Sequence, residues 1–195
     1  MSIARLVNRY QWHLATASLA FLLVAPALLK AADEKPAGKE DDTNITAVKR
    51  QTLKGFTYFY KSNETTFDGI RETVEKLIPD LHKALAEGNV ALRGPLVFIY
   101  HGVTPDPKVK FTLEIGMIVA EGTKPVGDFK VRDVPEYHCA SVLYSGPVKG
   151  LGGAFEKLYS EAAPKVTDEA REMYLYFEGP ESPNNVIHVS AGTKD

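Results

Sequence analysis

The sequence predicts an α+β fold built from two copies of one unit, in which a strand, a helix and two further strands follow each other (βαββ). The first observation is that this order of elements is predicted twice, over residues 55–120 and again over residues 129–192. The second is that apolar positions of the two predicted helices match at an offset of 81: Ile70, Val74, Leu77 and Ile78 align with Leu151, Phe155, Leu158 and Tyr159. Two such modules are expected to pair around a pseudo-twofold axis, and the seam between them is the natural binding site.

The first module begins with the aromatic, β-prone segment 55–61, "GFTYFYK". The helix that follows has apolar residues in steps of three and four from Phe67 to Leu85. Thr65 or Thr66 can cap its start, Gly88 suits its end, and Pro79 is expected to kink it or to split it in two. Residues 94–102 and about 110–120 form the two remaining strands.

The second module contains strand residues up to Tyr144, a helix over 147–162, and strands over 171–179 and 185–192. Aligning the strands pairs Tyr60 with Tyr144 at an offset of 84 and Tyr100 with Tyr176 at an offset of 76. Aromatic rings can stack on a flat ligand or a cation, and we expect at least two of these four tyrosines to line the seam.

The first 32 residues differ from the rest of the chain. They contain three basic residues and no acidic one, and residues 14–29 form an apolar run that is short for a membrane span. This pattern predicts a signal peptide at residues 1–32, cleaved after Ala31 or Ala32, and a secreted or periplasmic protein. An uncleaved membrane anchor is the alternative. The polar residues 33–44 are predicted to be a flexible linker, and residues 45–195 form the domain.

Composition excludes several classes of function. The formal net charge is −2 and becomes −5 once residues 1–32 are removed, so nucleic acid is not an expected partner. The single cysteine, Cys139, cannot form an internal disulfide. His101, His138 and His188 are scattered without metal-ligand spacing, so neither a metal nor a cofactor is expected.

Four segments together resemble the GyrI-like (gyrase-inhibitor-like) effector-binding domains, which are related to the SOUL haem-binding proteins. They are "RGPLVFIYHG", then "FTLEIGMIV" after a turn, "HCASVLYSGPVKGLGGAFEKLY", and the closing "YFEGPESP". The similarity covers roughly residues 45–192. It implies that both modules contribute to one curved antiparallel sheet with helices on one side. It also implies a groove between the modules that binds small organic molecules, often aromatic cations.

The resemblance directs attention to Glu114, an acid inside the apolar strand 111–119. Members of the family often place an acid in the groove, and Glu114 matches that position in the first module. The expected ligand-binding residues are therefore Glu114, Tyr60, Tyr100, Tyr144 and Tyr176. A glutamate on a solvated sheet face is the alternative explanation for Glu114.

The leading hypothesis is an exported, stand-alone domain that holds a small aromatic or cationic organic ligand, rather than an enzyme. One alternative is a hydrolase of electrophilic small molecules with Glu114 as general base. Another is haem binding, with His188 or His101 as the iron ligand. The sequence does not define the ligand or the oligomeric state.

Overall fold

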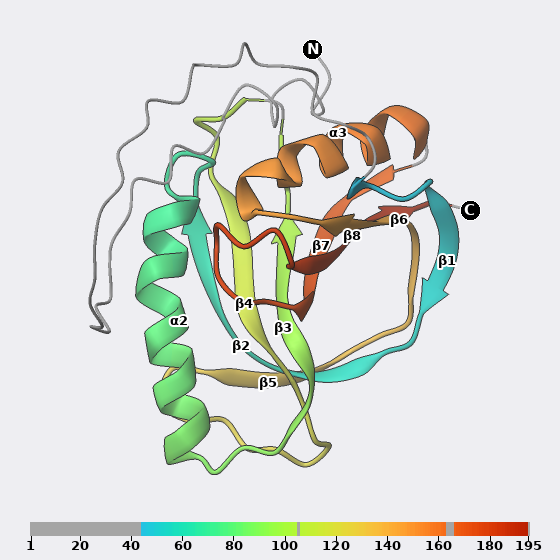
Figure 1. Ribbon diagram of the computed structural model, residues 1–195. Helices are drawn as coiled ribbons and strands as arrows, with labels where there is room; N and C mark the ends of the chain where they lie inside the picture. Colours follow the sequence, from blue (N-terminus) through green and yellow to red (C-terminus); the bar gives the residue numbers. More distant parts are fainter. Residues whose placement is uncertain (1–43, 105, 163–165, 195) are drawn as a thin grey trace, which may run out of the picture.

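The computed structural model describes residues 44–104, 106–162 and 166–194 (Figure 1). The predicted signal peptide and the predicted linker up to residue 43 lie outside this range. The strands are β1 (Lys49–Leu53), β2 (Phe56–Thr65), β3 (Leu92–His101), β4 (Phe111–Val119), β5 (Lys130–Val134), β6 (Tyr137–Ser145), β7 (Val166–Tyr176) and β8 (Val186–Thr193). The helices are α2 (Ile70–Glu87) and α3 (Leu151–Ala162), the latter preceded by the short 3₁₀ helix η2 (Val148–Gly150).

All strands belong to one antiparallel sheet with the order β1-β6-β8-β7-β3-β4-β2-β5. This order is symmetric about its centre, because exchanging β1–β4 with β5–β8 returns the same sequence of neighbours. The pseudo-twofold axis therefore passes between β3 and β7. The predicted fold of two βαββ modules in one curved antiparallel sheet is confirmed.

The strand pairing also corrects the alignment of the two modules. β1 and β5 begin 81 residues apart, at Lys49 and Lys130, as do α2 and α3. In the later strands, the pair Leu96–Met117 corresponds to Ala170–Ala191, an offset of 74. The offsets of 84 and 76 expected for the tyrosine pairs were therefore wrong. In the corrected alignment, Tyr60 is equivalent to Ser141 at the offset of 81. Tyr100 is equivalent to Tyr174, and Glu114 to His188, at the offset of 74.

The sheet is strongly curved because its edge strands continue into strands on the opposite side. β1 leads into β2 through Lys54 and Gly55, and β5 leads into β6 through Pro135 and Glu136. The continuous β1–β2 strand pairs with the continuous β5–β6 strand, because β1 pairs with β6 and β2 pairs with β5. Gly55 lies at this crossing, where a Cβ atom would come within 2.5 Å of the carbonyl oxygen of Val134. A residue other than glycine would separate the strands here.

The curvature gives the sheet two different faces. The helical face is covered by α2, which packs on β2 and β4, and by α3, which packs on β6 and β8. The central strands β3 and β7 lie between the two helices (Figure 1). The other face, which we call the inner face, carries a separate buried cluster of Tyr58, Val97, Ile99 and Val134.

Helix α2 is continuous through Pro79, so of the two outcomes expected for this proline the split did not occur. Its N-cap is Gly69 without a side-chain cap, although the Gly69 N–H donates to Oγ1 of Thr66. Gly88 ends the helix as expected. Within the described residues, no helix is long and apolar enough to cross a membrane.

Candidate functional site

A buried glutamate, Glu172 on β7, lies at the pseudo-twofold axis on the helical face. Its cross-strand partner on β3 is Phe98, which is also its equivalent in the first module at the offset of 74. The side chains of Tyr100 and Tyr174 are related by the same symmetry, and both hydroxyls donate to this carboxylate, at 2.9 and 2.7 Å. Glu172 is only 5% exposed. The axis therefore passes through one carboxylate held between two symmetry-related tyrosines.

Aromatic rings surround this carboxylate. Tyr100 packs against Phe111 and Phe155, with ring centroids 6.1 and 6.3 Å apart. Tyr174 packs against Phe98 at 5.1 Å and against Phe177 at 5.5 Å. Phe177 is 45% exposed, so this aromatic cluster extends from the buried carboxylate to the surface. Rings arranged in this way offer both apolar area and negative π faces to a ligand.

The electrostatics of Glu172 favour a positive ligand. Burial raises the pKa of Glu172, and the two tyrosine hydrogen bonds only partly oppose this effect. Burial, and then the neighbouring carboxylate, raise the pKa of Tyr100 and Tyr174 well above the ordinary value, so both stay protonated donors. Among the described residues, no basic side chain forms an ion pair with Glu172. A cation beside it would offset the cost of the desolvated charge.

Glu114 has a different environment from the one expected for it. Residues alternate along β4, so Glu114 points to the inner face while Leu113 and Ile115 join the core under the helices. Its carboxylate accepts a 2.6 Å hydrogen bond from Arg132, and His101 lies 3.5 Å from the same oxygen. Burial raises the pKa of Glu114, but the hydrogen bonds from His101 and Arg132 outweigh it and hold the pKa below the ordinary value.

Glu114 therefore already has its cation, and of the four predicted tyrosines Tyr60 lies beside that cation. The Arg132 guanidinium lies over the rings of Tyr60 and Tyr58, at 5.2 and 5.9 Å, and these two rings stack on each other. Tyr100 lies on the opposite face of the sheet. A carboxylate with a bound guanidinium and a lowered pKa is a weak general base.

The four predicted tyrosines separate into different environments. Only Tyr100 contacts Glu172. Tyr144 is buried on the helical face and donates to the carbonyl oxygen of Pro147. Tyr60 lies on the inner face, and Tyr176 is 52% exposed with its hydroxyl on Glu178. The symmetric partner of Tyr100 is Tyr174, which the sequence alignment missed.

Glu172 could have been found from the sequence. Its neighbours two residues away, Ala170 and Tyr174, point to the same face of a strand and are apolar. The equivalent neighbours of Glu114 are Thr112 and Gly116, which are compatible with a wetted face. An acid flanked at both i−2 and i+2 by apolar side chains is the stronger indication of a buried carboxylate.

The GyrI-like small molecule binding domain profile matches residues 46–189. No curated protein matches the chain significantly. The EcmrR chain in its DNA complex is similar, with a TM-score of 0.66 and 15% identity over 78% of this chain; this chain spans 59% of that one.

Two further solved structures share the fold. The EcmrR C-terminal domain has a TM-score of 0.64 and 16% identity, with 76% of this chain and 97% of that chain covered. SAV2435 bound to tetraphenylphosphonium has a TM-score of 0.54 and 14% identity, with 76% and 94% covered. At such identities the similarity shows the fold alone. Because the family profile spans most of the sequence, however, the chain belongs to the GyrI-like family of small-molecule-binding domains.

Proposed function

We propose that this protein binds aromatic organic cations at Glu172, between α2 and α3. The observation that carries the proposal is a buried carboxylate whose described partners are two tyrosine hydroxyls, with aromatic rings leading from it to the surface. A buried charge without a counter-ion is costly, and a cationic ligand would remove that cost. The rings of Tyr100 and Tyr174 would flank the cation.

The tetraphenylphosphonium complex of SAV2435 supports the choice of this cation as a probe. We expect calorimetric titration with tetraphenylphosphonium to show binding, and neutral triphenylphosphine oxide to bind far more weakly. Glu172→Gln should weaken the binding of the cation by about 2–3 kcal/mol, or roughly 30- to 150-fold in affinity, as for other desolvated charge pairs. Glu161→Gln, an exposed glutamate on α3, is the matched control. Equal cation affinity in wild type and folded Glu172→Gln would refute the role of this carboxylate.

The affinity should also depend on pH. Burial raises the pKa of Glu172, and a bound cation would lower it again, so binding releases a proton while the free site is protonated. Tetraphenylphosphonium has no titrating group. Its affinity should therefore rise as the pH increases through the pKa of the free site, and Glu172→Gln should lose this dependence.

Export is the second part of the proposal. It is supported by the basic start, the short apolar run and the small residues around Ala31 and Ala32. Mass spectrometry of the full chain produced in a secreting host should detect a mature form that begins near residue 32 or 33. Retention of residues 1–32 in the purified protein would contradict cleavage and favour the membrane-anchor alternative.

A further inference from the structure

Three buried polar atoms without a hydrogen-bond partner among the described residues lie together on the inner face of the second module. They are Nη1 of Arg171, Nδ1 of His188 and Oγ of Ser190. These residues are 3%, 8% and 0% exposed. Native proteins pair nearly all such groups, so unpaired atoms gathered on neighbouring strands require an explanation. None of these residues belongs to the Glu172 site, because they point away from the helices.

The strand register places these side chains next to each other. Arg171 on β7 is the direct cross-strand partner of Ser190 on β8, and Ser190 is in turn the partner of Ser141 on β6. His188 precedes Ser190 by two positions and lies on the same face of β8. Gln51 is already engaged, since its amide nitrogen lies 2.7 Å from Oγ of Ser141 and 3.0 Å from Nε2 of His188.

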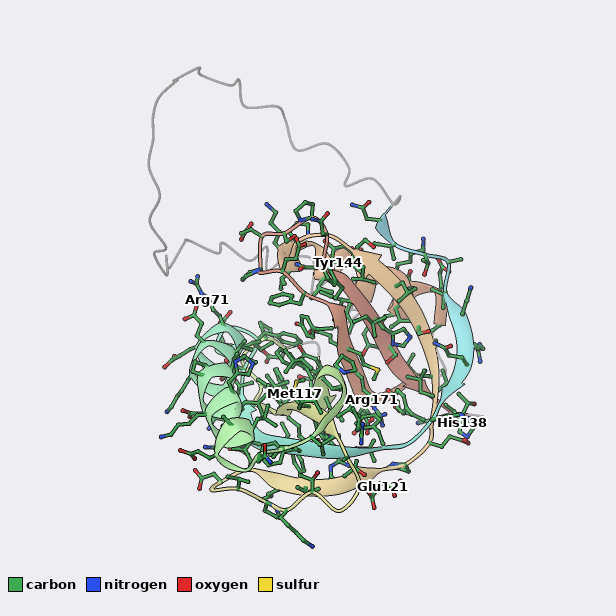
Figure 2. The ribbon with its side chains drawn as sticks, turned by 60° about the horizontal axis from the view of Figure 1, so that its bottom comes forward. Arg71, Met117, Glu121, His138, Tyr144 and Arg171 are labelled. Atoms are coloured by element: carbon green, nitrogen blue, oxygen red, sulfur yellow. The ribbon has the colours of Figure 1, made fainter. Side chains whose placement is uncertain are left out.

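Arg171 presents one free edge of its guanidinium. Its Nε and Nη2 both donate to Oε1 of Glu169, at 2.7 and 2.6 Å, and its Cζ atom lies 3.6 Å from the ring centroid of Tyr137. Figure 2 shows Arg171 on the inner side of the sheet, which is turned towards the β1–β2 strand. The Phe56 ring on β2, 5.9 Å away, agrees with this placement. The ion pair thus fixes the guanidinium while leaving Nη1 available as a donor.

Comparison of the two modules shows that aromatic side chains of the first are replaced by polar ones in the second at this place. In the first module, the rings of Tyr58 and Tyr60 fill the inner face beneath Arg132. At the offset of 81 their counterparts are Cys139 and Ser141, which are nonetheless almost fully buried. On β7 and β8 the change runs the other way, since Arg171 and Ser190 stand where the first module has Val97 and Gly116. The second module thus exchanges ring volume for polar side chains, and three of their atoms have no partner among the described residues.

The chemistry of the free groups indicates an oxyanion with an apolar tail. A guanidinium N–H can only donate, and a serine hydroxyl can donate as well, so an acceptor such as a carboxylate satisfies both. Towards solvent, the cross-strand partners of His188 are Leu143 and Met173. Leu143 is 39% exposed, and Met173 is half-buried. An apolar chain can leave the site along these two side chains.

We infer that the inner face of the second module binds a small aliphatic carboxylate, with its head on Nη1 of Arg171 and Oγ of Ser190 and its chain along Met173 and Leu143. This site is separate from the Glu172 site and takes a ligand of opposite charge. The other charged groups on this face are already matched, since Arg132 pairs with Glu114 and His101 lies between Glu114 and Glu169.

The state of His188 is consistent with this ligand. Burial lowers the pKa of its imidazole, so the ring is neutral in the free protein at neutral pH. Because the Gln51 amide nitrogen can only donate, Nε2 of His188 is the acceptor, and the neutral ring carries its proton on Nδ1, where it can donate to a carboxylate. Carboxylate binding should therefore need no protonation of the ring and should change little with pH around neutrality. Octanoate is a suitable probe, because its own pKa lies well below this range.

The test is calorimetric titration of the full-length protein with octanoate and with 1-octanol. We expect octanoate to bind and octanol to bind at least about tenfold more weakly, because the alcohol lacks the charge that strengthens hydrogen bonding to Arg171. Ser190→Val should lower the affinity for octanoate at least about tenfold and leave the affinity for tetraphenylphosphonium unchanged. Glu172→Gln should lower the affinity for tetraphenylphosphonium and leave that for octanoate unchanged. Ser160→Val, an exposed serine on α3, is the matched control.

Failure of wild-type octanoate binding would overturn the inference, as would equal binding by a folded Ser190→Val variant. A crystal soaked with octanoate that holds only water on the three atoms would also overturn it. If Ser190→Val does not fold, NMR of the His188 imidazole in the wild-type protein is the alternative test. Its Nδ1 signal should move on addition of octanoate and stay in place on addition of octanol; an unchanged signal with octanoate refutes the site.

Discussion

Replacing Glu172 by glutamine should stabilise the ligand-free protein while weakening its affinity for a cation. In the folded state Glu172 is 5% exposed and accepts hydrogen bonds from two tyrosines. Each bond to a charged group contributes about 1.5–3 kcal/mol, while desolvating the carboxylate costs several kcal/mol. The two bonds do not fully offset burial, which agrees with the raised pKa. Glutamine keeps the shape and removes the charge.

The expected gain at pH 8 is roughly 1–3 kcal/mol in the free energy of unfolding, by analogy with other neutralised buried charges. For a chain of this length this corresponds to a Tm higher by about 2–10 °C. The sign of the pH dependence follows from the raised folded-state pKa. The wild type keeps its full stability below the unfolded value near 4.5 and loses part of it as the pH rises through the folded pKa.

Thermal unfolding of wild type, Glu172→Gln and the exposed control Glu161→Gln should be followed between pH 4 and pH 9. The advantage of Glu172→Gln should vanish at the acidic end and grow towards the alkaline end, while the control follows the wild type throughout. A Glu172→Gln variant that is less stable than the wild type at pH 8 would show that the carboxylate stabilises the fold. The hydrogen bonds from the two tyrosines would then more than offset the cost of burying the charge of Glu172.

Three further predictions concern the inner face. Arg132→Met should lower the free energy of unfolding by about 2–3 kcal/mol, because it leaves Glu114 without its cation. This is less than the full cost of a buried unpaired charge, since the side chain of Arg132 is one-third exposed. In chemical denaturation, adding Glu114→Gln to this variant should recover most of the lost stability. Gly116→Ala should destabilise the protein by several kcal/mol, because the added Cβ would collide with the carbonyl oxygen of Phe59. A denaturation midpoint equal to that of the wild type would contradict this close approach. Cys139, 1% exposed and with its pKa raised by burial to about 11, should react with a thiol reagent at pH 8 only after unfolding, and rapid labelling of the folded protein would show that the inner face opens.

The sequence predicted the architecture well because apolar periodicity and duplication are both local signals. The helix positions from Ile70 to Ile78 matched their counterparts because each must bury the same face on the same sheet. The break between β1 and β2 and the pairing of β1 with β6 were not predicted, since they depend on contacts between residues about ninety positions apart, such as Lys49 and Ser141.

The site was harder to predict than the fold. Alternation along a strand indicates which side chains share a face, but not which face the helices cover. Both Glu114 and Glu172 lie inside strands, and only their neighbours two residues away distinguish them in the sequence. In the structure one lies beside Arg132 and the other between two tyrosines. A misplaced offset then paired Tyr100 with Tyr176 instead of Tyr174, so the symmetric arrangement around Glu172 was missed.

The position of Glu172 on the axis has a consequence for the ancestry of the domain. A single-module ancestor that assembled as a homodimer through the β3–β7 contact would have placed two copies of the same residue opposite each other, where Phe98 and Glu172 now meet. Two facing carboxylates would repel, and two facing phenylalanines would carry no charge. Because both modules belong to one chain, the two halves can differ, and a single carboxylate can lie at the centre of an otherwise symmetric protein.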